Sequence, residues 1–106
     1  MQLQLKTWQF VDDYLKSKTG IMIPIGSTEQ HGPTGLIGTD ALTAEMIARG
    51  AGEKAGALVA PTISVGMAQH HLAFAGSVTL RPTTLIAVVR DTVVSLARHE
   101  IGRAHV

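Results

Sequence analysis

The chain contains no cysteine, and its 106 residues include few charged and few aromatic side chains. The absence of cysteine excludes a disulfide scaffold, a thiolate metal site and a cysteine nucleophile, so any metal must be held by His, Asp and Glu. Charged residues make up 16% of the chain and aromatic residues 4%, against 45% hydrophobic residues, a composition typical of a globular protein. This length allows one modest domain.

Basic clusters and long apolar runs are also missing. The formal net charge is +1 and the nine Lys and Arg residues are scattered, so nothing indicates nucleic acid or a membrane as a partner, and a small polar ligand fits better. No stretch approaches the ~20 apolar residues of a membrane span, and the first residues lack the pattern of a signal peptide. We therefore expect a soluble, cytoplasmic protein.

Helical patterns alternate with short apolar segments. Thr7 can cap a short helix that ends near Gly20, residues 41–56 have helical spacing with Gly56 as a stop, and Pro82 suits the first turn of a helix over residues 82–100. Along this last helix one face repeats as Leu85, Val89, Thr92 and Leu96. Strands are predicted over residues 21–26, 57–64 and 77–80. This order indicates an α/β fold around a mainly parallel sheet.

The stretch "PIGSTEQHGPTGLIGTD", residues 24–40, concentrates polar side chains among turn-forming residues. Glu29 and His31 are two positions apart, so in an extended backbone both point to one side, and Asp40 follows at the start of the next helix. Open α/β sheets place their ligands where a strand ends and a helix begins. Carboxylate and imidazole ligands suit Zn²⁺ or Mn²⁺ and, less readily, Fe²⁺.

The same residues have ordinary structural explanations. Thr39 or Asp40 is a natural N-cap of the following helix. Glu29 would then be a solvated loop carboxylate, and His31 would donate a hydrogen bond to a backbone carbonyl. The spacing of these residues does not decide between a metal site and a polar loop.

The motif "IPIGSTEQHGP" followed by "GTD" resembles the creatininase family of metal-dependent amidohydrolases. The resemblance extends to "VGMAQHHLAFAGSVTL" and to the helix ending in "SLARHE", and covers residues 7–100. It implies a three-layer α/β/α fold with a mainly parallel sheet, and a protein that hydrolyses a non-peptide, cyclic or linear amide C–N bond.

The resemblance also implies a two-metal centre, with two Zn²⁺ or Mn²⁺ ions per full-length subunit. Glu29, His31 and Asp40 match the family's metal ligands, and the aspartate bridges the two ions. His71 matches a histidine of the family's second loop, where it implies a second-shell or substrate-facing role; a histidine satisfied by backbone contacts is the alternative. His70 stands where relatives often have an acidic residue, and we expect it to be exposed.

Two departures from the family pattern limit these expectations. The residues after Pro33 are "TGLIG", so Thr34 replaces a histidine and puts the substrate preference in doubt. The "NGHGGN"-like segment that supplies the remaining ligands is absent. The last six residues, "IGRAHV", resemble a translated sequencing adapter, so we expect residues 1–100 to be the N-terminal part of one creatininase-like domain, with its C-terminal half missing, and residues 101–106 to be a non-native tail.

Several functions remain open. The leading hypothesis is a creatininase-type amide hydrolase whose 106-residue piece is inactive; the alternatives are a formamide deformylase of the same family and a non-catalytic metal-binding or assembly module. The resemblance implies a homo-oligomer, often a hexamer, for the full-length protein. Its partner would be a small-molecule amide substrate.

Overall fold

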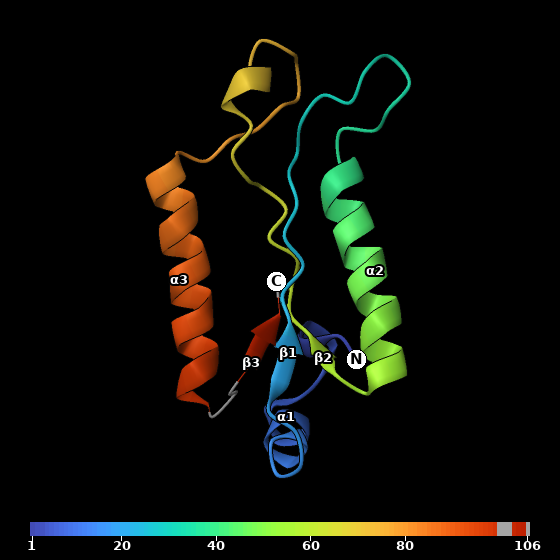
Figure 1. The fold of residues 1–106 in the computed structure, drawn as a ribbon, viewed down its shortest axis with the longest axis vertical. Coiled ribbons are helices and arrows are strands. Elements are labelled where there is room, and N and C mark those ends of the chain that lie inside the picture. The colour runs from blue at the N-terminus through green and yellow to red at the C-terminus, as the bar shows by residue number, and fades with distance from the viewer. Residues whose placement is uncertain (100–102, 106) are drawn as a thin grey trace.

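A computed structural model describes residues 1–99 and 103–105 as a small parallel sheet between helices (Figure 1). The helices are α1 (Trp8–Tyr14), α2 (Thr39–Ala55) and α3 (Pro82–Arg98), and the strands are β1 (Gly20–Met22), β2 (Leu58–Val59) and β3 (Arg103–His105). The strand order is β2-β1-β3, and both outer strands pair with β1 in parallel, with Ile21 opposite Leu58 and Ala104. The parallel α/β arrangement predicted from the sequence is therefore present.

The third strand does not come from the expected segment. Residues 77–80 form no strand; an isolated antiparallel bridge joins Val78 to Thr28. The physical reason is that the N–H groups of this segment donate to two separate parts of the chain. The Val78 N–H donates to the Thr28 carbonyl, and the Leu80 N–H donates to the Gly66 carbonyl. Strand β3 instead lies within residues 101–106. That these residues are a non-native tail remains a prediction.

The helix ends follow the sequence signals closely. The Thr7 hydroxyl accepts a hydrogen bond from the Phe10 N–H at 3.2 Å, so it caps α1 as predicted, although this helix ends at Tyr14 and not near Gly20. Pro82 opens α3. Gly56 ends α2 in the left-handed conformation, with φ of 62°, which glycine adopts without a steric penalty.

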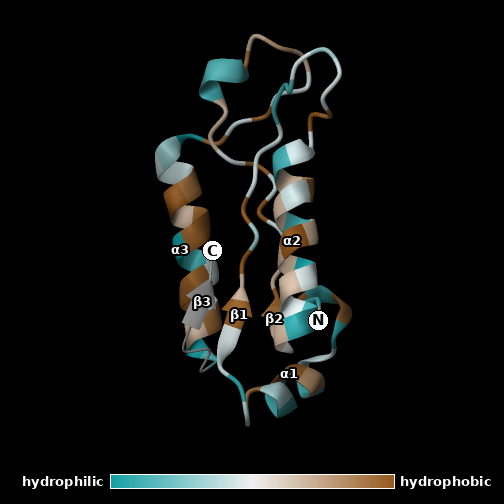
Figure 2. Cartoon of the chain, turned by 45° about the vertical axis from the view of Figure 1, so that its right-hand side comes forward, coloured by the Kyte–Doolittle hydropathy of each residue, from teal (hydrophilic) through white to brown (hydrophobic). Residues whose placement is uncertain are grey.

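The core is centred on β1 and β2. Its buried residues are Tyr14, Ile21, Ile23, Leu58 and Ala60. The Tyr14 hydroxyl donates to the Gly20 carbonyl at 2.6 Å and accepts from the Leu58 N–H at 3.3 Å, so it ties α1 to the start of both strands. Figure 2 shows the apolar residues of β1 and β2 between the two long helices.

The two long helices use different side chains against this core. The predicted face of α3 is the less exposed one, since Leu85, Val89, Thr92 and Leu96 are all half-buried. Helix α2 instead buries Ala41 and Gly52, and leaves Leu42 and Met46 exposed. Small residues on the inner face allow its backbone to lie close to β2. Within residues 1–99 and 103–105, the helices are too short or too polar to cross a membrane.

Candidate metal centre

The candidate ligands lie where the chain leaves the sheet. The segment after β1 runs into the loop that precedes α2, and the loop between β2 and α3 lies at the same end of the molecule (Figure 1). This is the carboxyl end of β1, the position at which open α/β sheets bind ligands.

Backbone hydrogen bonds fix the segment that carries Glu29. The Glu29 N–H donates to the Ile37 carbonyl at 3.0 Å, and the next N–H, of Gln30, donates to the Ser77 hydroxyl at 3.0 Å. One neighbour comes from the loop before α2 and the other from the loop before α3. Glu29 is therefore held between the two loops.

Gly26 allows this segment to approach α2. A Cβ atom at position 26 would collide with the backbone of Ala41 in the first turn of the helix. Only glycine permits such a close contact between two backbones. The contact brings the N-terminus of α2, and with it Asp40, beside the extended segment that leads from β1 to Glu29.

Asp40 is not the N-cap of α2, so that explanation is wrong. The cap position is Gly38, which has no side-chain cap, and Asp40 lies inside the first turn. Its Oδ1 atom is 3.6 Å from His31 Nε2, and both side chains are 37% exposed. This separation exceeds ordinary hydrogen-bond length, so the two groups face each other without a short bond.

Glu29 is not a solvated carboxylate, because its side chain is only 14% exposed. Its Oε2 atom lies 3.3 Å from His71 Nε2, yet it is buried and has no aligned hydrogen-bond partner in the described part of the chain. Buried polar atoms are nearly always paired. An unpaired carboxylate oxygen of this kind is open to a further partner, such as a cation.

Of the three predicted ligands, the structure places His31 and Asp40 face to face, whereas Glu29 is paired with His71, which was not predicted to be a ligand. Among the described residues, Glu29, His70 and His71 form a group in which one ligand atom of each lies within 4.8 Å of the others, whereas Glu29, His31 and Asp40 do not. The three-residue metal site remains a prediction.

The two adjacent histidines differ in environment. His70 is exposed, as predicted, whereas His71 is half-buried. The His71 ring contacts side chains, since its Nδ1 atom is 2.9 Å from Gln30 Nε2 and its Nε2 atom faces Glu29. The alternative of a histidine satisfied by backbone is therefore wrong. Sequence reasoning missed Gln30, whose position between Glu29 and His31 was the available signal.

A pocket of about 530 Å³ opens beside these residues. It is lined by Gln30, His31, Gly32, Pro33, Gly35, Ile37, Phe74 and Ala75. A small molecule in this pocket would contact the His31 face of the candidate centre.

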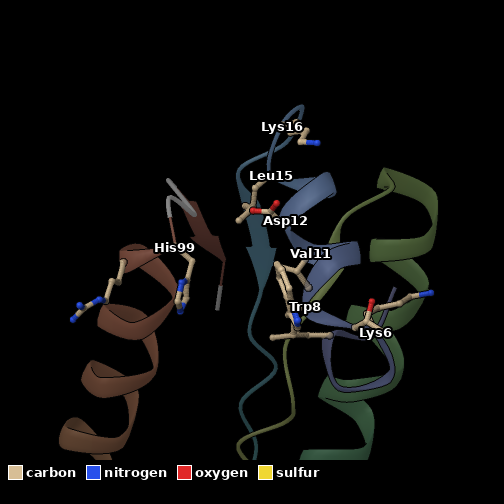
Figure 3. A pocket seen from close by; sticks show the side chains of 10 residues that line it. Lys6, Trp8, Val11, Asp12, Leu15, Lys16 and His99 are labelled. Carbon is tan, nitrogen blue, oxygen red and sulfur yellow. The ribbon is translucent and has the colours of Figure 1, made fainter.

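A larger pocket of about 820 Å³ lies elsewhere, between α1 and the end of α3. Figure 3 shows Trp8 and Val11 of α1, and Leu15 directly after it, across from His99. Its lining includes none of the candidate metal ligands.

Comparisons with known proteins agree with this picture. A sequence model of the creatininase family (creatinine amidohydrolase) matches residues 4–106. The creatinine amidohydrolase of Pseudomonas putida is 32% identical over 88 residues, which cover 78% of this chain and 34% of that protein. The 3-dehydro-scyllo-inosose hydrolase of Thermotoga maritima is 33% identical over 84 residues, covering 78% of this chain and 27% of that protein.

Solved structures match nearly the whole chain. A manganese form of creatininase superimposes with a TM-score of 0.91, and a mutant creatininase of the Zn-Zn type with 0.90. Each is 28% identical and covers 97% of this chain and 42% of the solved chain. The α/β fold class expected from the sequence is thereby confirmed. The chain spans less than half the length of these proteins.

Proposed function

The chain belongs to the creatininase family, and from this premise we propose that a complete protein containing this sequence is a metal-dependent hydrolase of a non-peptide amide C–N bond. Glu29, His31 and Asp40 are the proposed metal ligands. The buried Glu29 Oε2 atom, which lacks a hydrogen-bond partner among the described residues, is the observation that carries the proposal. The contact with His71 Nε2 at 3.3 Å is not aligned as a hydrogen bond, so a divalent cation would supply the partner that this buried oxygen lacks.

The donor atoms fit the metals of the family. Carboxylate oxygens and an imidazole nitrogen suit Zn²⁺ and Mn²⁺, and the matching solved structures include a manganese form and a Zn-Zn type. We propose the same ions here, two per full-length subunit. Bound in this way, they would polarise an amide carbonyl and lower the pKa of a water molecule.

The chain's own residues would hold and orient the reacting groups. Asp40, free of a capping role, would hold metal with its two carboxylate oxygens. The pocket beside His31 leaves room for a small amide. An open pocket next to the ligands favours catalysis over a closed structural site, in which every metal position is taken by protein.

The 106-residue polypeptide alone is proposed to be a weak metal binder that hydrolyses little. Glu29, His31 and Asp40 provide three ligand side chains, whereas two zinc ions in tetrahedral sites need more, even with a shared aspartate. A purified 106-residue chain that retained two metals and matched the turnover of a full-length enzyme would contradict this part of the proposal.

Replacing Asp40 by asparagine tests the proposed site in the complete protein. Asp40→Asn should lose metal content and amide hydrolysis together, because the amide carries no charge and cannot bridge two cations. Creatinine and a formamide are the substrates to assay, since the formamide deformylase is the alternative within the family. The exposed Asp91→Asn variant on α3 is the matched control. Full metal content without hydrolysis of any amide by the unmodified protein would favour a metal-binding module, and unchanged metal in Asp40→Asn would exclude the site.

A further inference from the structure

The Gln30 side chain is held in one orientation between a backbone group and a histidine ring. The Gly32 N–H donates to Gln30 Oε1 at 2.8 Å, and Gln30 Nε2 lies 2.9 Å from His71 Nδ1. A backbone N–H can only donate, so the atom facing Gly32 must be the amide oxygen. The amide nitrogen is therefore the atom that faces His71.

This orientation determines which nitrogen of a neutral His71 ring carries the proton. An amide nitrogen can only donate, so Nδ1 must accept with its lone pair, and the ring proton is then on Nε2. His71 Nε2 is the atom that lies 3.3 Å from Glu29 Oε2. The Nε2–H therefore lies beside Glu29 Oε2 without forming an aligned hydrogen bond to it.

We propose that Gln30 fixes the Nε2–H tautomer of His71, and that His71 in turn positions the Glu29 carboxylate for metal binding. The proposal rests on the proposed function, in which Glu29 is a metal ligand. Gln30 and His71 are positioning residues, because neither needs to contact the metal. Groups that orient metal ligands through hydrogen bonds commonly change metal affinity by about 10–100-fold when they are removed.

Hydrogen bonds hold the backbone that carries Gln30 and His71. The His71 N–H donates to the Ala68 carbonyl at 3.0 Å within the helical turn Gln69–His71, and the Gln30 N–H donates to the Ser77 hydroxyl at 3.0 Å. The His71 ring also packs against Phe74, with ring centroids 6.4 Å apart. Gln30 and His71 are therefore both anchored through their backbone N–H groups.

A competing arrangement uses the same residues as ligands. Glu29, His70 and His71 could hold one cation, since one ligand atom of each lies within 4.8 Å of the others. His71 would then need a lone pair on Nε2, which requires the proton on Nδ1. Gln30 disfavours that tautomer, because its amide nitrogen needs Nδ1 as an acceptor. Which ring nitrogen carries the proton therefore distinguishes the two arrangements.

The tautomer can be measured directly on the 106-residue chain without metal. In ¹⁵N-histidine-labelled protein, under mildly alkaline conditions that keep free imidazole neutral, long-range ¹H–¹⁵N spectra distinguish the two nitrogens. The signals of the His71 ring are identified as those missing from the spectrum of the His71→Gln variant. We expect the Nε2–H tautomer in the unmodified chain and the Nδ1–H tautomer in Gln30→Glu, whose carboxylate can only accept. An Nδ1–H ring in the unmodified chain, or no change in Gln30→Glu, would overturn the role of Gln30.

Metal affinity then tests the role of His71, with Zn²⁺ in competition with a chelator as the probe. His71→Ala should weaken binding about 10–100-fold, whereas His71→Gln, which keeps an N–H donor near the position of Nε2, should restore most of it. Equal losses in both variants would show a direct ligand and overturn the proposal. Glu29→Gln tests the premise that Glu29 is a metal ligand. If this variant leaves the Zn²⁺ affinity unchanged, the proposed site is wrong, while the tautomer result stands.

Discussion

At the scale of single residues, the site depends on a few contacts that only one residue type can make. Gly26 lets the segment after β1 touch the backbone of α2, and the Tyr14 hydroxyl forms hydrogen bonds to the first residues of β1 and β2. Asp40 lies inside the first turn of α2 and does not cap it, so its carboxylate faces His31. Substitutions at these positions should therefore have specific effects.

Gly26→Ala should lower the free energy of unfolding by about 1–3 kcal/mol, because the added methyl group meets the Ala41 backbone, which cannot rotate away. Urea denaturation of the 106-residue chain measures this. The control is Gly50→Ala, where a Cβ meets nothing within 4 Å in the middle of α2 and should stabilise by about 0.5–1 kcal/mol. Equal effects of the two substitutions would contradict the close packing.

Tyr14→Phe removes the hydroxyl and leaves the Gly20 carbonyl and the Leu58 N–H without this partner. We expect a loss of about 1–3 kcal/mol in the free energy of unfolding, the usual penalty for unpaired buried polar groups. Thermal unfolding followed by circular dichroism gives the value. A midpoint identical to that of the unmodified chain would show that the two bonds contribute nothing.

At the scale of elements, caps and short strands define the frame around the site. Thr7 opens α1, Pro82 opens α3 and Gly56 closes α2. These signals are local, so they could be predicted from the sequence. The path of the loops could not, because it depends on contacts between segments far apart in the chain.

Thr7→Ala tests one of these caps. The substitution removes the acceptor of the Phe10 N–H, and we expect α1 to fray and the chain to lose about 1 kcal/mol of stability. Thr43→Ala, on the exposed side of α2, should cost nothing, because alanine has the higher helix propensity. Equal losses in both variants would mean that the hydroxyl of Thr7 does not act as a cap.

Local sequence signals predicted the face of α3 correctly, but they could not predict which distant segments would make contact. The apolar face of α3 repeats every three to four residues, and the structure places Leu85 and Leu96 on its less exposed side. The strand predicted over residues 77–80 failed because an apolar run does not reveal which partner each N–H will find. For the same reason, the spacing of Glu29 and His31 could not show that Glu29 would face His71.

At the scale of the whole molecule, the described part of the chain leaves much apolar surface uncovered. On α2, Met46 and Ile47 are 70% and 67% exposed, and Ile86 on α3 is 67% exposed. Exposed apolar residues grouped on one element are typical of surfaces that contact another protein segment. The homo-oligomer implied by the family resemblance remains a prediction.

The 106-residue chain should therefore self-associate as its concentration rises. Size-exclusion chromatography with light scattering should show masses above the 11.2 kDa of the chain. Replacing Met46 and Ile47 together by lysine should reduce the association, since both side chains are exposed and their loss removes no core contact. A stable monomer at every concentration would contradict this expectation.

Metal binding by the candidate ligands tests the central claim most directly. The measurement is the zinc content of the 106-residue chain after dialysis against a slight excess of Zn²⁺, for the unmodified chain, for Asp91→Asn and for a variant combining Glu29→Gln, His31→Asn and Asp40→Asn. Zinc should bind weakly to the first two, and its content should fall to background in the combined variant if that variant keeps its helical circular dichroism. Equal zinc in all three chains would contradict the account.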